Sequence, residues 1–458
     1  MDFAERMLKL KERREALTQG REDASSALNR VLGLLDPGSF IQTDAYRTGG
    51  HAVTGYGLIN ARPVYVAAQD AGNEGGAMTR EQSEKLLKLI DLAESTGAPL
   101  VLMPDSLGTR VEEGAQVLAA FADVFARLSK LSGYCPVITL LAGQAAGIAA
   151  QFVALSDFVV TVEGKGYAAP FAASVVNAVN ATDAKEAELA GAPALYASGV
   201  AALKAADEDE ALVLIRELVD LLPSSSYETS PFEDSDGLNR LLAMPPKEGA
   251  ELVNELCDEG RLMELYAGLE TEASVYLGRV GGYACGIVLA KGRFDAAGCD
   301  KISGFVRFCD AYDLPVITLV DSEGLAVPEN SRLAELMKAS GSLLSVYAQA
   351  TTPKLAVICG NAVGAAYVSL AGKALSDITY AWPSAYVAPL TVDAAVQTFM
   401  LDELRETDRG TLAAKAEEQA DAFAAAQAGL VDDVIDPAET RKHLIAALEL
   451  LQTKSTVL

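Results

Sequence analysis

Two short glycine-containing segments are the part of this sequence best suited to chemistry. Gly143–Gly147 and Gly360–Gly364 each follow a short apolar run and precede a stretch of small residues. A turn between a strand and a helix N-terminus presents backbone N–H groups that no helix carbonyl uses, and such groups bind anionic oxygens. The pattern therefore predicts two oxyanion-binding turns. A single G-x-x-x-G pattern would favour another interpretation, in which small residues only let a helix pack closely on a strand.

Few side chains are suited to acid–base or metal chemistry. The chain has two histidines, His51 and His443, and one tryptophan. A Ser-His-Asp mechanism or a histidine metal site has almost no material to work with. We therefore expect both histidines to be structural and no metal to bind.

Cysteine usage and the first residues indicate the compartment. None of the six cysteines forms a C-x-x-C pair: Cys135, Cys257, Cys285, Cys299, Cys309 and Cys359. They are typical of buried thiols in a reducing cytoplasm, not of disulfides or a zinc site. The start of the chain is charged, and no apolar stretch resembles a signal peptide or a membrane span. We therefore expect a cytoplasmic location.

Size and charge narrow the class further. With 458 residues, half of them hydrophobic, the chain can bury the cores of two or three domains. The net charge of −26 would repel nucleic acid and anionic membranes. Neither is an expected partner.

The two glycine-containing segments belong to a longer internal repeat. Gly147 is matched about 220 residues later by Gly364, and three further segments recur in the same order at nearly that distance. These are Asp36–Phe40 with Asp258–Leu262, Gly57–Ala67 with Gly278–Val288, and Gly97–Ser106 with Asp313–Ser322. We infer two domains of one fold, residues 1–225 and 226–458, and the linker-like composition of Leu222–Pro231 agrees with a boundary there. This duplication favours the oxyanion interpretation of both turns.

Each half alternates predicted strands and helices. Thr79 and Gln82 have capping-box spacing before an amphipathic helix that Gly97 can end. The first half continues with a strand at 99–103, a helix at 113–131, a strand at 137–142, a helix from about 146, a strand at 158–162 and a helix at 207–222. The second half has a helix at 301–312, a strand at 316–320, a helix at 331–349, a strand at 355–359, a helix from about 363 and a helical tail at 402–450. Such alternation predicts parallel strands with right-handed crossovers.

With these features, the sequence resembles the carboxyltransferase subunits of acetyl-, propionyl- and methylmalonyl-CoA carboxylases and related decarboxylases, in the crotonase superfamily. The resemblance extends from about Ala27 to Leu448. It rests on the order and spacing of segments that are individually weak: Gln69-Asp70, Gly75-Gly76, Asp105–Arg110, Gly143–Asp157, Arg307–Ala311, Ala350–Lys354 and Tyr380–Ser384. The implied fold class is α/β, a tandem duplication of a crotonase-like (ClpP/crotonase) ββα superhelix unit.

The resemblance implies a reaction that needs few acid–base side chains. Carboxyl transfer to an acyl-CoA requires an α-carbanion, stabilised as a thioester enolate. The N-carboxybiotin donor leaves negative charge on its ureido oxygen, and its released nitrogen can act as the base. The protein then has to supply fixed N–H donors, each worth roughly 3–4 kcal/mol in comparable sites.

The resemblance also assigns the donors. The amides of Gly147 and Ile148 would face the thioester, and those of Gly364 and Ala365 would serve biotin. Ile148 and Ala365 stand where the family has glycine, and a positive φ would strain Ile148. Further departures are Gly360 and Asn361 in place of two basic residues, Leu107 and Thr109 within an Asp-Ser-Gly-Gly-Ala-Arg motif, and Gln82 in place of a histidine. These departures leave the acyl substrate open.

Cofactor binding is expected to involve CoA on this chain and biotin from elsewhere. The resemblance places Lys85 and Arg110 near the CoA phosphates, with Gly76 and Gly108 in the same cofactor-binding set, whereas Arg80 is as well explained as a solvated surface charge. No biotin-acceptor motif or ATP-binding pattern is present. The expected partners are therefore a biotin carboxyl carrier protein and either a biotin carboxylase or a decarboxylase membrane subunit. Self-association as a dimer or dimer-based hexamer is also implied, with the active site between the first half of one subunit and the second half of another.

Two other functions are compatible with the repeat. A crotonase-type hydratase, isomerase or hydrolase needs a carboxylate beside its oxyanion hole, and no acidic residue follows Gly147 before Asp157. The substitutions at Ile148, Gly360 and Asn361 would also suit a non-catalytic scaffold subunit that binds acyl-CoA. Neither acyl chain length nor the direction of carboxyl transfer follows from the sequence.

Overall fold

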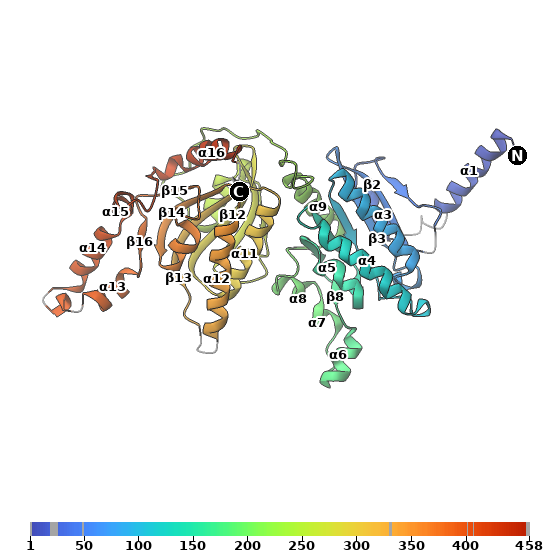
Figure 1. Cartoon of the computed structure of the whole chain (residues 1–458), viewed down its shortest axis with the longest axis horizontal. Coiled ribbons are helices and arrows are strands. Elements are labelled where there is room, and N and C mark those ends of the chain that lie inside the picture. Colours follow the sequence, from blue (N-terminus) through green and yellow to red (C-terminus); the bar gives the residue numbers. More distant parts are fainter. Residues whose placement is uncertain are drawn as a thin grey trace. The chain divides into compact units, whose positions relative to one another are not determined.

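The chain folds into two compact units, Met1–Glu228 and Thr229–Leu458, which are described one at a time below (Figure 1). The computed structural model describes residues 2–18, 26–47, 50–328, 332–400, 402–405 and 407–454. Within those ranges, no helix combines the length and the apolar character needed to cross a membrane.

The first unit is built around a seven-stranded sheet in the order β1-β2-β3-β4-β5-β7-β9. Its strands are β1 (Ile41–Thr43), β2 (Ala52–Ile59), β3 (Arg62–Gln69), β4 (Leu100–Met103), β5 (Val137–Leu141), β7 (Phe158–Val162) and β9 (Leu203–Ala205). Pairing is antiparallel from β1 to β3 and parallel from β3 to β9. The prediction of parallel strands is therefore confirmed for the βα part, while the sequence pattern does not reveal the β2–β3 hairpin.

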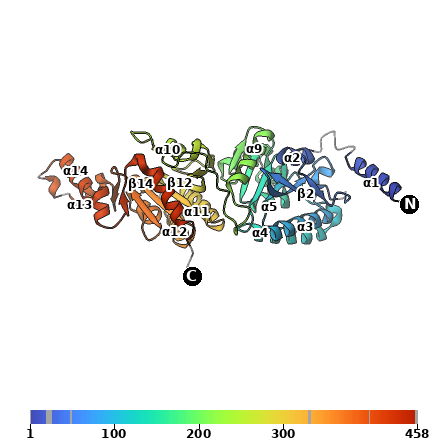
Figure 2. The same cartoon turned by 90° about the horizontal axis from the view of Figure 1, so that it is seen from above.

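Helices cover both faces of this sheet. The helices described in this unit are α1 (Phe3–Thr18), α2 (Ser26–Leu34), α3 (Arg80–Thr96), α4 (Ala115–Leu131), α5 (Ala150–Ala154), α6 (Ala173–Asn180), α7 (Glu186–Ala190), α8 (Ala192–Ala197) and α9 (Glu208–Leu221). Figure 2 shows α2 and α9 on one face and α3 and α4 on the other. Two short strands, β6 (Gln144–Ala146) and β8 (Tyr167–Ala169), form a separate parallel pair.

Helix α3 forms where its sequence signals place it. The Thr79 hydroxyl accepts the Gln82 N–H at 3.1 Å and caps the first turn. Gly97 ends the helix in the left-handed region, at φ 65°. The residues buried toward α4 and the sheet recur at helical spacing: Leu86, Leu89, Ile90 and Ala93.

The second unit repeats this architecture. Its sheet follows the order β10-β11-β12-β13-β14-β15-β17, with β16 paired to β14. The strands are β10 (Leu262–Leu265), β11 (Ala273–Val280), β12 (Tyr283–Phe294), β13 (Val316–Leu325), β14 (Lys354–Val363), β15 (Ile378–Ala381), β16 (Tyr386–Ala388) and β17 (Asp433–Val434). The helices are α10 (Gly249–Leu256), α11 (Ala296–Ala311), α12 (Leu333–Gln349), α13 (Val392–Phe399), α14 (Arg409–Gln419), α15 (Ala422–Gln427) and α16 (Thr440–Leu451). The α/β duplication is thus confirmed.

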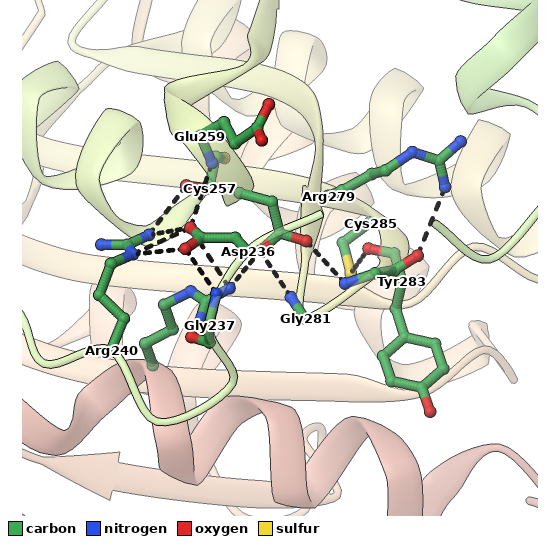
Figure 3. Close-up of polar contacts among 12 residues, drawn as sticks. Asp236, Gly237, Arg240, Cys257, Glu259, Arg279, Gly281, Tyr283 and Cys285 are labelled. Carbon is green, nitrogen blue, oxygen red and sulfur yellow. Dashed lines mark hydrogen bonds and ion pairs between the residues drawn. The ribbon is translucent and has the colours of Figure 1, made fainter. Parts of the chain in front are cut away.

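In each unit, one aspartate side chain binds the backbone amides of the β-hairpin turn, and this shared contact shows the repeat in atomic detail. Asp36 accepts both N–H groups of the β2–β3 turn at 3.2 and 3.0 Å, and Asp258 accepts both of the β11–β12 turn at 2.8 and 2.6 Å. An arginine from a later helix pairs with each carboxylate, Arg216 from α9 and Arg441 from α16. Figure 3 shows the second network around Gly281.

The segments around the two glycine-containing turns differ from the predicted helices. Ala146 and Val363, the expected helix starts, are instead the last residues of β6 and β14. β6 pairs with β8, and the end of β14 pairs with β16. Alanine suits a closely packed strand as well as a helix, so its presence does not distinguish the two. Ser331, the predicted start of another helix, lies outside the described residues, and that helix begins at Leu333.

Candidate functional site

The first-unit turn presents two backbone amides at the beginning of a helix. Gly147 has φ 62°, with no heavy atom within 4 Å of where a Cβ would stand, and it begins a 3₁₀ turn that leads into α5. The N–H groups of Gly147 and Ile148 belong to the first turn, where no helix carbonyl can accept them. In the described chain, neither donates to another strand or loop. The start of this helical turn therefore leaves two amides without an acceptor in the described chain.

Ile148 fits this turn without backbone strain, although its side chain is β-branched. The positive φ belongs to Gly147, the one residue of the pair that tolerates it, and Ile148 takes an ordinary φ. Its side chain packs against the hydrophobic core of the first unit. The isoleucine therefore keeps the N–H of the family's glycine and adds an apolar wall beside it.

Two glycine loops lie next to this turn. A Cβ on Gly76, at φ 67°, would meet the Asp105 carbonyl oxygen at 2.0 Å, so only glycine fits there. The loop that carries Gly108 bonds to the Gly76 loop, since the Met78 N–H donates to the Gly108 carbonyl at 2.9 Å. It also bonds to β6, because the Ala146 N–H donates to the neighbouring Ser106 carbonyl at 3.0 Å. The structure thus brings together Gly76, Gly108 and the Gly147 turn.

The second-unit turn copies the first but uses its amides differently. Gly364 has φ 54°, and its N–H donates to the Ala388 carbonyl of β16 at 2.9 Å. The Ala365 N–H makes no such bond to another strand or loop of the described residues. Of the predicted pair Gly364 and Ala365, Ala365 is therefore the amide placed to donate to a ligand, and Gly364 fixes the turn to the sheet.

Lys85 occupies a position unlike the one expected for a phosphate ligand. Its side chain is 3% exposed, and its Nζ donates to the Ala52 carbonyl at 3.3 Å. Lys301, at the matching position of α11, donates to the Leu269 carbonyl at the same distance, and burial lowers the pKa of Lys301. A buried lysine that holds the chain before the hairpin is thus part of the repeated fold, and the structure does not turn the Lys85 ammonium to solvent.

Arg110 is the solvent-accessible cation of the predicted set. Its guanidinium pairs with Glu74, whose Oε2 also lies 3.4 Å from His51 Nε2. Glu74 is exposed, so this ion pair is screened and worth about 1 kcal/mol or less. An anionic ligand could therefore replace Glu74 at Arg110 at little cost. Arg80 instead bonds to Gln116 at the surface, at 2.9 Å.

The first acidic residue that follows Gly147 in the sequence does not lie beside the turn. Asp157, the first acidic residue after Gly147, accepts the Ser132 hydroxyl at 2.6 Å and the Val137 N–H at 2.8 Å. Val137 is the first residue of β5, whereas the segment Gly143–Gly147 follows the last residue of β5. Asp157 therefore holds the opposite end of that strand.

Sequence reasoning missed the residues that hold the first turn in place. Asp105 stands out as part of the repeat and of the Asp105–Arg110 segment, which indicates no support role, and Arg30 belongs to no motif. The pairing of Asp105 with Asp321, and of Gly143 with Gly360, was the available signal. Spacing does not show that Asp105 lies against Gly143 and that Asp321 lies against Gly360.

Comparison with known proteins agrees with this geometry. Residues 20–458 match the carboxyl transferase domain family. The chain is 32% identical to the carboxyltransferase subunit of propionyl-CoA carboxylase from Haloferax mediterranei, over 99% of this chain and 97% of that protein. It is also 32% identical to the methylmalonyl-CoA carboxyltransferase 12S subunit from Propionibacterium freudenreichii subsp. shermanii, over 95% and 90%.

The fold is similar to that of a solved carboxyltransferase. The crystal structure of transcarboxylase 12S, a hexamer with methylmalonyl-CoA and methylmalonic acid bound, superposes with a TM-score of 0.92 at 29% identity, covering 100% of this chain and 97% of that one. The crotonase-type α/β duplication inferred from the sequence is thereby confirmed. The chain belongs to the carboxyl transferase family, whose members include the carboxyltransferase subunits of biotin-dependent acyl-CoA carboxylases.

Proposed function

We propose that this chain transfers a carboxyl group between carboxybiotin, carried on a separate protein, and a short-chain acyl-CoA of the propionyl- and methylmalonyl-CoA class. The observation that carries the proposal is the Gly147 turn, where two amides without internal partners begin a helix. The names of the relatives support the substrate class.

The residues of the chain have one main task in this reaction. The amides of Gly147 and Ile148 donate to the thioester oxygen as negative charge builds on it, which stabilises the enolate. The Ala365 amide does the same for the ureido oxygen of biotin, the group that brings the carboxyl. Since Ile148 and Ala365 both retain their N–H groups, their departures from glycine are compatible with activity.

A direct assay tests the proposal. Purified protein mixed with methylmalonyl-CoA and free biotin should decarboxylate the thioester in a biotin-dependent manner. Gly147→Val should lower kcat about 10²–10³-fold, because the altered turn misplaces two donors. Gly164→Val is the matched control, since Gly164 also has a positive φ of 69° and open space around it. A protein that processes none of the acyl-CoA thioesters in a biotin-dependent reaction would refute the function.

Self-association is the second part of the proposal. Transcarboxylase 12S is a hexamer. Helix α6 of this chain projects from its sheet (Figure 1), and its Val175 and Val179 side chains are exposed. We place each active site between the first unit of one subunit and the second unit of another. Mixed oligomers of Gly147→Val and Gly364→Val subunits should then regain activity, because one site in each pair receives two intact units. Sites formed within one subunit would give no recovery.

A further inference from the structure

The aspartate after β4 contacts the glycine-containing turn directly. Asp105 Oδ1 accepts the Gln144 N–H at 3.1 Å, at the start of β6. Gly143 lies against the same carboxylate, and a Cβ there would approach it to 2.3 Å. The next residue, Ser106, accepts the Ala146 N–H at its carbonyl and donates its own N–H to the Gln144 carbonyl at 2.6 Å. Residues 105 and 106 therefore hold the whole of β6, up to the glycine that begins the helix.

A buried arginine fixes that aspartate from the other side. Arg30 is 7% exposed, and its Nη1 donates to Asp105 Oδ2 at 3.1 Å. Its Nη2 also donates to the Ala142 carbonyl at 2.8 Å, and its Nε donates to Glu208 at 2.8 Å. The arginine thus joins α2, α9, the end of β5 and the Asp105 carboxylate. Charge-assisted bonds inside the protein are strong and directional, so both oxygens of Asp105 are held.

The backbone of Asp105 is held as well. Its N–H donates to Gln69 Oε1 at 3.1 Å, and Gln69 Nε2 donates to Gln82 Oε1 at 3.2 Å. Both glutamine side chains are buried. The chain of bonds therefore runs from α3 through β3 to the turn, and Gln82, which replaces the family's histidine, is one of its links.

The second unit contains the same contact. Asp321 Oδ1 accepts the Asn361 N–H at 2.9 Å, and a Cβ on Gly360 would meet that oxygen at 2.2 Å. Both copies of this turn therefore require a glycine, and the amide of the residue that follows it donates to the aspartate. It gives a physical reason for glycine at 143 and 360, apart from any role in binding.

We propose that Asp105, fixed by Arg30, is the positioning residue of the first-unit turn and sets where the Gly147 and Ile148 amides point. It acts through the Gln144 amide and β6, without touching the acyl-CoA. This inference rests on the proposed function for its catalytic consequence, but its structural part can be measured without activity.

Amide hydrogen exchange tests the structural part. Asp105→Asn replaces one acceptor oxygen by an NH₂ group, so either the Gln144 N–H or Arg30 loses its partner. Exchange in residues 144–150 should become at least about tenfold faster. Asp36→Asn is the matched control, because Asp36 also binds two backbone amides and an arginine in the same unit but holds the β2–β3 turn. Equal exchange in 144–150 for wild type and Asp105→Asn overturns the proposal.

Kinetics test the catalytic part with methylmalonyl-CoA and free biotin. Asp105→Asn should lower kcat about 10–100-fold and leave KM for the thioester within about threefold, since misplaced donors weaken the transition state more than the bound substrate. Asp36→Asn should keep the wild-type kcat. If Asp105→Asn fails to fold, Arg30→Lys keeps the charge beside Asp105, and it should show the same split in smaller measure. If the wild type is active and these variants have the same kcat as the wild type, the positioning role is refuted. If the wild type is inactive but exchange is faster in Asp105→Asn, only the proposed function is refuted.

Discussion

Arg441 and Asp258 form an ion pair inside the second unit whose side chains are 0% and 2% exposed. Arg216 and Asp36 form the corresponding pair of the first unit, and they are 28% and 27% exposed. The two pairs brace the same hairpin, so the repeat provides one interaction in a buried and in a half-exposed setting. Burial is the main difference between them, and it should decide what each pair contributes to stability.

Removing the carboxylate should therefore have unequal effects. Asp258→Asn should lower the free energy of unfolding by about 3–5 kcal/mol, because Arg441 is left as a buried charge whose remaining carboxylate partner among the described residues is Asp236, at 3.6 Å. Asp36→Asn should cost about 1 kcal/mol, since water can replace part of the lost interaction. Urea unfolding of the two variants and wild type measures both values. Equal losses would show that burial does not control the contribution.

Acid should weaken the second unit through Asp236. The side chain of Arg240, which donates to this carboxylate at 2.9 Å, lowers the pKa of Asp236 from 3.8 to about 2. A carboxylate with a depressed pKa in the folded state stabilises the fold at pH values above 3.8, and this contribution is lost as the pH falls toward 2. The stability difference between wild type and Asp236→Asn should shrink over that range, as urea unfolding at successive pH values would measure. A difference that stays constant from pH 5 to about 2 would contradict this assignment.

The thiols should be inert in the folded protein. Burial raises the pKa of Cys135, Cys257 and Cys299 to about 12. Because only the thiolate reacts, these groups should resist a disulfide reagent at pH 8 and react within minutes once urea unfolds the chain. Titration with a chromogenic disulfide before and after unfolding gives the counts. Rapid reaction of these three thiols in the native protein would show that their surroundings open readily.

The sequence predicted the parts of the fold that rest on local signals. The cap at Thr79, the stop at Gly97 and strand β7 follow from nearest-neighbour chemistry or from a short apolar run, and the structure has them within a few residues of their predicted positions. The first hairpin was less visible. The β2–β3 turn uses Asn60 and Ala61 at positive φ, where glycine would have been the usual signal.

The location of the candidate site was predictable from the sequence, but the contacts that hold its turns in place were not. Gly147 and Gly364 stand out because the repeat duplicates them, whereas the amide of Gly364 is taken by a contact with Ala388 from a strand further along the chain. The sequence resemblance predicted Lys85 as a phosphate ligand, but the structure buries its side chain. Such assignments depend on long-range packing, which neither spacing nor composition contains.

The Ala365 amide provides the sharpest test of the second turn. Ala365→Pro removes the N–H at a helix N-terminus, where proline is tolerated, and so deletes the proposed donor with little change of fold. Biotin-dependent turnover should fall about 10²–10³-fold, while the dissociation constant for methylmalonyl-CoA stays near the wild-type value. Ala365→Ser keeps the N–H and should retain most of the activity. If Ala365→Pro turns over as fast as Ala365→Ser, the donor to biotin must be sought elsewhere in the second unit.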